Sequence, residues 1–117
     1  MITATASRSE VQIQAECFQY LWNHYPLTRR CFFHVPNGGS RNRIEGMQLK
    51  ASGVVAGVPD MLLMWKGRAY GFEFKTPTGV LSPAQKEVHE AWTSQGINVF
   101  VVRSFEQFRE LIEKIIK

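Results

Sequence analysis

Asp60, Glu73 and Lys75 are the residues of this sequence whose types and spacing could support catalysis. Asp60 directly follows Pro59, and thirteen residues later Glu73 and Lys75 flank a single phenylalanine. All three lie in the stretch GVPDMLLMWKGRAYGFEFK, which is otherwise largely apolar. Charged side chains rarely enter a protein interior without a partner. The elements that carry these three residues therefore have to hold them in a defined arrangement.

Residues 61–65 and 69–75 are predicted to form a β-hairpin around the short connection KGR. The first segment is apolar at every position, which is typical of a strand covered on both faces. Side chains alternate across a strand, so Glu73 and Lys75 would project from one face of the second segment. The glutamate and the lysine would then lie side by side, while the phenylalanines next to them point the other way.

The register of this hairpin decides how close Asp60 comes to the other two residues. We expect a two-residue turn at Gly67 and Arg68. In that register Asp60 lies opposite Lys75 and diagonal to Glu73, within about 5 to 8 Å. A three-residue turn would shift every pair by one position.

Two carboxylates this close together indicate a metal site, because they repel each other unless a cation lies between them. Oxygen ligands favour a hard ion, so we expect Asp60 and Glu73 to hold Mg²⁺, with Mn²⁺ able to replace it. Lys75 could orient the attacking water and offset the charge that develops at phosphorus. Phosphodiester hydrolysis needs these parts. In the alternative interpretation, Glu73 and Lys75 form an exposed ion pair and Asp60 is a turn residue.

Periodicity, capping residues and glycines predict the elements around the hairpin. Helices are predicted from about residue 9 to 24, at 40–52, from 82 to a stop at Gly96, and from 104 onward. Strands are predicted at 30–35 and 97–102. The order α-β-α-β-β-α-β-α indicates an α/β fold, and 117 residues are the usual length of one domain.

The ends of these helices are also readable from the sequence. Ser7 and Glu10 have the spacing of a capping box before the first helix, and Ser82 and Gln85 have the same spacing before the third. The second helix has Ser40 as a candidate cap and Gly53 as a candidate stop. The first helix is inferred from apolar residues three and four apart, which are Val11, Ala15, Phe18, Trp22 and Tyr25.

Composition excludes several classes of protein. No apolar run approaches the roughly 20 residues that span a bilayer, and the first ten residues lack the order of a signal peptide, so we expect a cytoplasmic protein. Cys17 and Cys31 suggest neither a disulfide framework nor a zinc site. The net charge of +4 is compatible with a polyanionic partner without requiring one.

The pattern Pro59-Asp60 followed by Glu73-Phe74-Lys75 resembles the PD-(D/E)-x-K signature of restriction enzymes and junction resolvases. The surrounding segments VPNGGSRNRIEGMQLKASGVVAGVPDM, FEFKTPTGVLSPAQKEVHEAW and GINVFVVRSFEQFRELI resemble stand-alone VRR-NUC (virus-type replication-repair nuclease) domains of phages. The resemblance covers roughly residues 10–116. The order of GVPD, EFK and LSPAQ along the chain is its most specific part.

This resemblance implies a Mg²⁺-dependent DNA endonuclease with the restriction-endonuclease-like core, a mixed β-sheet flanked by helices. Such proteins are often homodimers that act on branched DNA, such as four-way (Holliday) junctions. Asp60, Glu73 and the backbone carbonyl of Phe74 would hold the metal, and Lys75 would assist the water.

The resemblance also implies two further residues of the site. A helix-borne glutamate would join it, and Glu10 matches better than Glu16. Gln85 corresponds to a glutamine that often follows E-x-K. Each of the two matched residues has a local alternative, because Glu10 could serve the helix start and Gln85 could be the capping partner of Ser82.

The segment VPNGGSRNR is a candidate DNA contact, through Asn37, Arg41 and Arg43. Free N–H groups and arginines at the start of a helix can bind a phosphate, although a glycine-rich turn with solvated arginines is the alternative. Scattered basic residues are weaker candidates, namely Arg29, Arg30, Lys50, Lys66 and Arg68. The three histidines have no metal-ligand spacing and are interpreted as packing or surface residues, namely His24, His34 and His89.

Two other functions remain open from the sequence. The protein could cut flaps or single strands, as a monomer or within a larger complex. It could also be a DNA-binding module without catalytic turnover. Intact Asp60, Glu73 and Lys75 disfavour that last possibility, because a binding module needs none of them.

Overall fold

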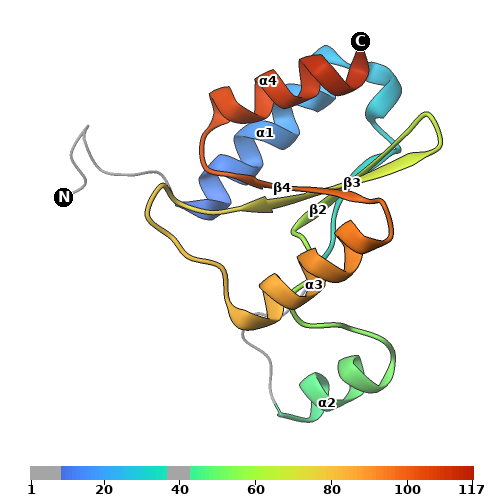
Figure 1. Cartoon of the computed structure of the whole chain (residues 1–117), viewed down its shortest axis with the longest axis vertical. Helices are drawn as coiled ribbons and strands as arrows, with labels where there is room; N and C mark the ends of the chain where they lie inside the picture. Colours follow the sequence, from blue (N-terminus) through green and yellow to red (C-terminus); the bar gives the residue numbers. More distant parts are fainter. Residues whose placement is uncertain (1–8, 37–42) are drawn as a thin grey trace.

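The structure of the protein, a computed structural model, describes residues 9–36 and 43–117 (Figure 1). Four strands form one mixed sheet in the order β1-β2-β3-β4. β1 pairs antiparallel with β2, β2 pairs antiparallel with β3, and β3 pairs parallel with β4. The strands are β1 (Phe32–His34), β2 (Met61–Trp65), β3 (Arg68–Phe74) and β4 (Asn98–Val102).

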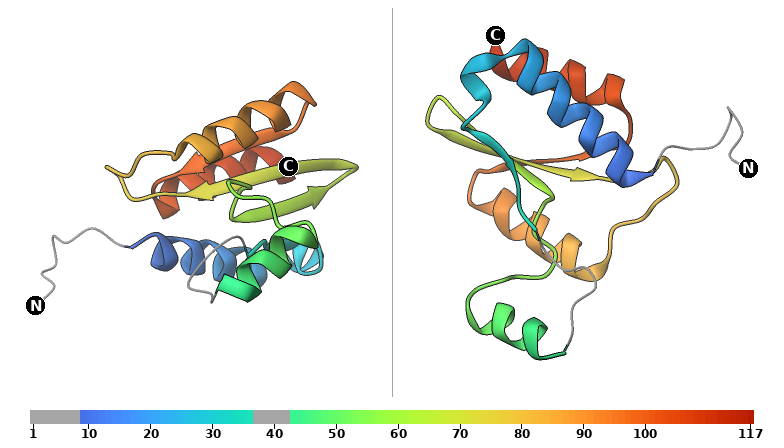
Figure 2. Two further views of the ribbon diagram at one scale, coloured as in Figure 1. Left: turned by 90° about the horizontal axis from the view of Figure 1, so that it is seen from below. Right: turned by 180° about the vertical axis from the view of Figure 1, so that it is seen from behind.

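The helices lie on both faces of this sheet. α1 and α4 pack together on one face and α3 covers the other, whereas α2 stands away from the sheet on the α3 side (Figures 1 and 2). The α-helices are α1 (Glu10–His24), α2 (Arg43–Ala51), α3 (Pro83–Ser94) and α4 (Phe105–Ile116), and a short 3-10 helix, η1, covers Pro26–Thr28. The predicted order of helices and strands and the α/β class are therefore confirmed.

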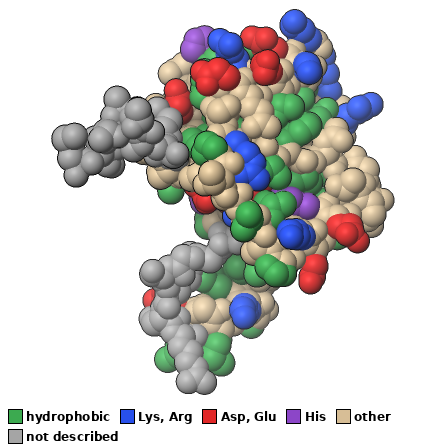
Figure 3. Space-filling model, turned by 60° about the vertical axis from the view of Figure 1, so that its left-hand side comes forward, with side chains coloured by type: hydrophobic (Ala, Val, Ile, Leu, Met, Phe, Trp, Pro, Cys, Tyr) green, Lys and Arg blue, Asp and Glu red, His purple; other side chains and the backbone are tan. Residues whose placement is uncertain are grey.

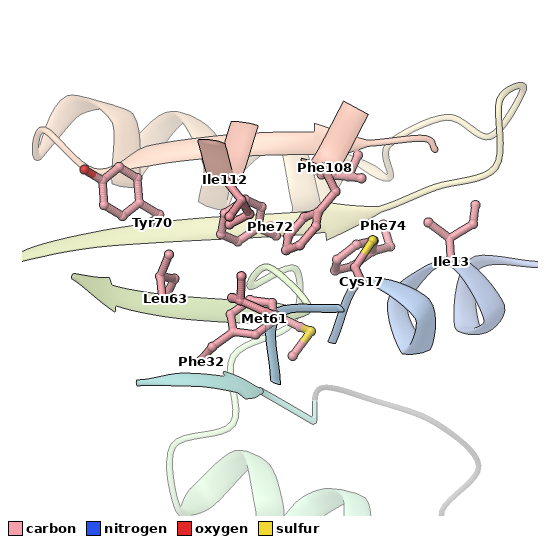
Figure 4. Close-up of a cluster of buried hydrophobic side chains, with 12 residues drawn as sticks. Ile13, Cys17, Phe32, Met61, Leu63, Tyr70, Phe72, Phe74, Phe108 and Ile112 are labelled. Atoms are coloured by element: carbon pink, nitrogen blue, oxygen red, sulfur yellow. The ribbon is translucent and has the colours of Figure 1, made fainter. Parts of the chain in front are cut away.

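The apolar core lies between the sheet and the α1–α4 pair (Figure 4). Phe72 and Phe74 point from β3 into it, and Phe108 of α4 packs against both rings, with centroids 5.3 and 6.2 Å away. All three are fully buried. The prediction that Phe72 and Phe74 point away from Glu73 is thus confirmed.

Two expectations for α1 need correction. The residue that caps this helix is Ser9, whose hydroxyl accepts the Gln12 N–H while the Gln12 side chain accepts the Ser9 N–H. Glu10 is the first residue of the helix and therefore is not the third helical residue that a capping box requires; its predicted partner, Ser7, lies outside the described residues.

The buried face of α1 also differs from the stripe that predicted the helix. Ile13, Cys17 and Leu21, at intervals of four, are the fully buried residues. Val11 is 75% exposed and Trp22 is 43% exposed. The helix contains two apolar stripes, and periodicity alone does not say which of them faces the core.

The register of the hairpin is the third correction. The two turn residues are Lys66 and Gly67, with φ of 50° and 77°, so that Trp65 pairs with Arg68 and Met61 pairs with Phe72. Positive φ at both positions is the geometry of a two-residue hairpin turn, and glycine adopts it without strain.

This register places Asp60, one residue before β2, opposite Glu73 and not opposite Lys75. The expected and observed registers differ by two residues. Since side chains alternate with a period of two, Asp60 and Glu73 still project from the same face.

The remaining boundaries follow the predictions closely. β1 is shorter than predicted, although hydrogen bonds at Cys31 and Val35 continue its pairing with β2. Gly53 and Gly96 adopt positive φ just after α2 and α3, where they end each helix as predicted. Cys17 and Cys31, both among the described residues, are not joined by a disulfide. In residues 9–36 and 43–117, no helix has the length and apolarity needed to cross a membrane.

Candidate active site

The segment before Asp60 packs directly on α3 and β3. A Cβ atom at Gly57, which has φ of 93°, would collide with the backbone carbonyl of Ala84 at the start of α3. Pro59 is buried and lies on Gly71 of β3, where a Cβ atom would come within 2.9 Å of the Pro59 ring and 3.2 Å of the Trp92 ring. The two glycines therefore allow three segments of the chain to meet.

Asp60 is anchored by its backbone and by its side chain. Its carbonyl accepts the Val35 N–H at 2.7 Å, and Nδ1 of His34 lies 2.8 Å from the same oxygen. Its Oδ2 accepts the backbone N–H of Phe74 at 2.7 Å. Asp60 is thus bonded to the end of β1 through its carbonyl and to the end of β3 through its carboxylate.

Glu73 is a charged side chain in an almost completely buried position, with 1% of its surface exposed. Its Oε2 accepts a hydrogen bond from Nε2 of Gln85 at 3.1 Å, and Nε2 of His89 lies 3.0 Å from its Oε1. Burial, together with the charge of Asp60 and a hydrogen bond to it, raises the pKa of Glu73 to about 9. Glu73 and Asp60 therefore form a carboxyl pair that does not readily carry two negative charges.

Lys75 lies beside this pair. Its N–H donates to the carbonyl of Val102 at 3.0 Å, which continues the β3–β4 pairing one residue beyond β3. Continued pairing keeps the half-buried Lys75 side chain on the same face as Glu73. Its positive charge lowers the pKa of Glu73 and so opposes part of the effect of burial.

Gln85 completes the capping box of α3 and also contacts Glu73. Its Oε1 accepts the Ser82 N–H at 2.8 Å and its N–H donates to the Ser82 hydroxyl at 3.1 Å, which completes the capping box. Its Nε2 remains free to donate to Glu73. The start of α3 is therefore tied to the carboxylate on β3.

His89 is a residue of the site that sequence reasoning missed. The prediction of a packing or surface histidine is wrong for this residue, because it pairs with the buried carboxylate of Glu73. Burial lowers the pKa of His89, with the nearby charge of Asp60 acting in the opposite direction. Its position four residues after Gln85, one helical turn along the same face, is the signal that could have identified it.

Of the two candidate glutamates on α1, the structure brings Glu10 toward the site. Its carboxylate lies near Gly79, and its charge contributes to the raised pKa of Glu73. Glu16 lies six residues further along α1, about 120° around the helix from Glu10.

The proposed DNA contacts are only partly described. Asn37 and Arg41 lie outside the described residues, and Arg43 begins α2. Arg29 is occupied locally, because its Nε donates to the Trp22 carbonyl and its guanidinium lies 5.2 Å from the centroid of that ring. Figure 3 shows lysine and arginine side chains scattered among acidic and hydrophobic ones on one face of the molecule.

The site offers two carboxylates to a metal ion. Within the part of the chain that the structure describes, no three or more His, Cys, Asp and Glu side chains form a group that could hold a metal. Two carboxylates are nevertheless the usual protein contribution to a Mg²⁺ site, because waters and phosphate oxygens complete its coordination.

Comparisons with known proteins agree with this architecture. The family model of the VRR-NUC domain matches residues 4–106. A solved structure described as a VRR_NUC domain protein has a TM-score of 0.79 and 20% sequence identity, over 95% of this chain and 90% of that chain. At this identity the likeness shows the fold alone. No curated protein sequence matches this chain. Since the family model covers most of its length, the chain belongs to the VRR-NUC domain family and has a nuclease-type fold.

Proposed function

We propose that the protein is a Mg²⁺-dependent DNA endonuclease whose metal is held by Asp60 and Glu73. The observation that carries this proposal is the carboxyl pair formed by the buried Glu73 and the half-buried Asp60 on one face of the sheet. A hydrogen bond between the two groups and the raised pKa of Glu73 indicate that a proton stabilises the pair when no other cation does. A divalent cation between the carboxylates would take the place of that proton.

The residues present fit such a cation. Carboxylate oxygens are the ligands that Mg²⁺ and Mn²⁺ prefer, and the backbone carbonyl of Phe74 would be a third protein ligand. When bound, Mg²⁺ would neutralise the phosphate and lower the pKa of water, which favours hydrolysis to a 5′-phosphate and a 3′-hydroxyl.

The other side chains of the site would act around this ion. Lys75 would orient the water and stabilise the charge that develops on the phosphate, because its ammonium group lies on the same face as Glu73. Gln85 would hold Glu73 in place. Glu10 would be the helix-borne carboxylate at the margin of the site, since its charge already acts on Glu73.

DNA would approach the α3 side of the sheet, with Asn37, Arg41 and Arg43 as phosphate contacts. These residues precede or begin α2, which lies on that side (Figure 1). We propose branched DNA, such as a four-way junction, as the substrate; the sequence resemblance supports this choice.

Cleavage of labelled four-way junction, flap, duplex and single-stranded DNA tests this function. In Mg²⁺ the wild type should cut the junction, whereas in Ca²⁺ or EDTA it should not. Asp60→Asn and Glu73→Gln should each abolish cleavage. Lys75→Ala should lower the rate by roughly 10²- to 10³-fold while Mn²⁺ still binds, because the lysine acts on charge in the transition state.

A matched control is available on α3. Glu87 is an exposed carboxylate on this helix, so Glu87→Gln should cut at the wild-type rate. If no substrate were cut in Mg²⁺ or Mn²⁺, or if Asp60→Asn cut normally, the proposal would fail. Faster cleavage of flaps or single strands than of junctions would keep the chemistry and change the substrate.

We also propose that the active form is a homodimer, because symmetric cuts in both strands of a junction need two sites related by a two-fold axis. The edge strand β1 and α1 border a groove of about 670 Å³ with an apolar lining, and Phe33 at this edge is 42% exposed. A second copy would cover this surface.

Sedimentation at micromolar concentration tests the dimer. The wild type should sediment as a dimer, Phe33→Lys should sediment as a monomer, and Val80→Lys should remain dimeric because Val80 is an exposed residue outside this groove. A wild-type monomer that still made paired, symmetric cuts would contradict the proposal.

A further inference from the structure

His89 is held against the carboxylate that the proposed function assigns to the metal. Its side chain is 12% exposed, and its Nε2 lies 3.0 Å from Oε1 of Glu73. Gln85, one turn earlier on α3, donates to the other oxygen of the same carboxylate. A single helix therefore contacts both oxygens of Glu73.

Two such contacts fix how the carboxylate is turned. One hydrogen bond leaves a carboxylate free to rotate about its terminal bond, whereas one donor on each oxygen sets the direction of its plane. A carboxylate has about four lone-pair positions, so two donors leave about two for a cation. Asp60 acts on the same carboxyl group, because its charge contributes to the raised pKa of Glu73.

The helix α3 is itself anchored, which fixes the positions of the two side chains that contact Glu73. The capping box with Ser82 fixes Gln85, and the contacts of Gly57 with Ala84 hold the start of the helix against the segment that leads to Asp60. His89 therefore approaches Glu73 from a helix whose position is itself set by the Asp60 segment.

Resting on the proposed function, we infer that His89 is a positioning residue that orients Glu73 for metal binding by donating a hydrogen bond from Nε2. The histidine does not ligate the ion in this role, because its Nε2 is already directed at Glu73. Partners that orient metal ligands in this way typically contribute 10- to 100-fold to metal affinity or activity.

Binding of Mn²⁺ to the DNA-free protein tests the inference, read from the rise in the temperature of unfolding as Mn²⁺ is added. His89→Leu should weaken Mn²⁺ binding by roughly 10- to 100-fold. His89→Gln should restore most of the affinity, because a glutamine amide nitrogen reaches the position of Nε2. His89→Asn should not restore it, since its shorter amide reaches only the position of Nδ1.

A second readout separates positioning from a structural role. Cleavage by His89→Leu should recover toward the wild-type rate at high Mn²⁺, and its stability in EDTA should stay close to that of the wild type. His24→Leu, which removes an exposed histidine of α1, should leave Mn²⁺ affinity unchanged.

The possible failures are distinguishable. If the wild type bound Mn²⁺ and cut DNA while His89→Leu bound Mn²⁺ equally well, the inference alone would be overturned. Equal loss in His89→Gln and His89→Leu would overturn hydrogen-bond donation as the mechanism. A wild type that neither bound Mn²⁺ nor cut DNA would overturn the proposed function and this inference with it.

Discussion

Glu73 and Phe74 are neighbours on β3, and both are almost completely buried, yet their surroundings are opposite in kind. Phe74 lies among aromatic and aliphatic side chains of α1 and α4, whereas Glu73 meets a histidine and a glutamine of α3. α1 and α4 each contribute fully buried residues to the core, and none of residues 83–94 in α3 is fully buried. One face of the sheet thus carries the apolar core, and the other carries the polar cluster to which we assign the proposed chemistry.

The largest expected effect on folding lies on the apolar face. Phe108→Ala should lower the free energy of unfolding by about 3 to 5 kcal/mol, because it removes a fully buried ring that contacts Phe72 and Phe74. Urea denaturation measures this change. Met64→Ala, at a side chain that is 46% exposed, should cost much less. Similar losses in the free energy of unfolding for Phe108→Ala and Met64→Ala would contradict the assignment of the stabilising core to the α1–α4 face of the sheet.

The polar side chains on the α3 face of the sheet should instead make the stability of the protein depend on pH. Between about pH 4.5 and 9 the folded protein keeps a proton on Glu73 that the unfolded chain releases, so without metal its contribution to stability falls as pH rises. The contribution is complete below pH 4.5 and lost above 9. The slope is at most about 1.4 kcal/mol per pH unit.

Glu73→Gln should lack this dependence, because an amide does not titrate in this range. Unfolding temperatures in EDTA at several pH values would measure the difference. The variant should become the more stable of the two proteins as pH rises toward 9. Parallel pH profiles for the two proteins would show that the pair does not hold a proton in the folded state.

The smallest effect concerns which side of the sheet meets DNA. Arg43→Ala should reduce the slope of log K for DNA binding against log salt by about one, because each lost phosphate contact releases about one counterion fewer. Arg109→Ala, at an exposed position on α4, should leave the slope unchanged. Equal slopes for Arg43→Ala and the wild type would show that Arg43 makes no phosphate contact and is only a solvent-exposed arginine.

Local signals in the sequence predicted most of the fold. Alternation in GFEFK predicted which way Glu73 and its neighbours point, and the box at Ser82 and Gln85 predicted the start of α3. These features depend on residues within a few positions of one another. The capping box of α1 was misassigned because two overlapping serine patterns, at Ser7 and Ser9, both satisfy the rule.

Features that have more than one local solution, or that depend on distant segments, could not be predicted in the same way. The hairpin register depends on which two residues take positive φ, and KGR allows more than one choice. The spacing of four residues places His89 on the same face of α3 as Gln85, but only the packing of α3 against β3 decides that this face meets Glu73. The prediction that Asp60 and Glu73 lie close together on one face of the sheet was nevertheless correct. An error of two residues in the register leaves each side chain on the same face.

The packing of Gly57 on Ala84 and of Pro59 on Gly71 and Trp92 has a consequence for protein engineering. The motif Pro59-Asp60 and Glu73-Phe74-Lys75 is a few residues long, but its geometry depends on three segments that pack on one another, at residues 57–60, 71–75 and 82–92. A chimaera that exchanged one piece without the others would keep every letter of the motif and lose the fit between them. Recombination between relatives should therefore treat these three pieces as one module.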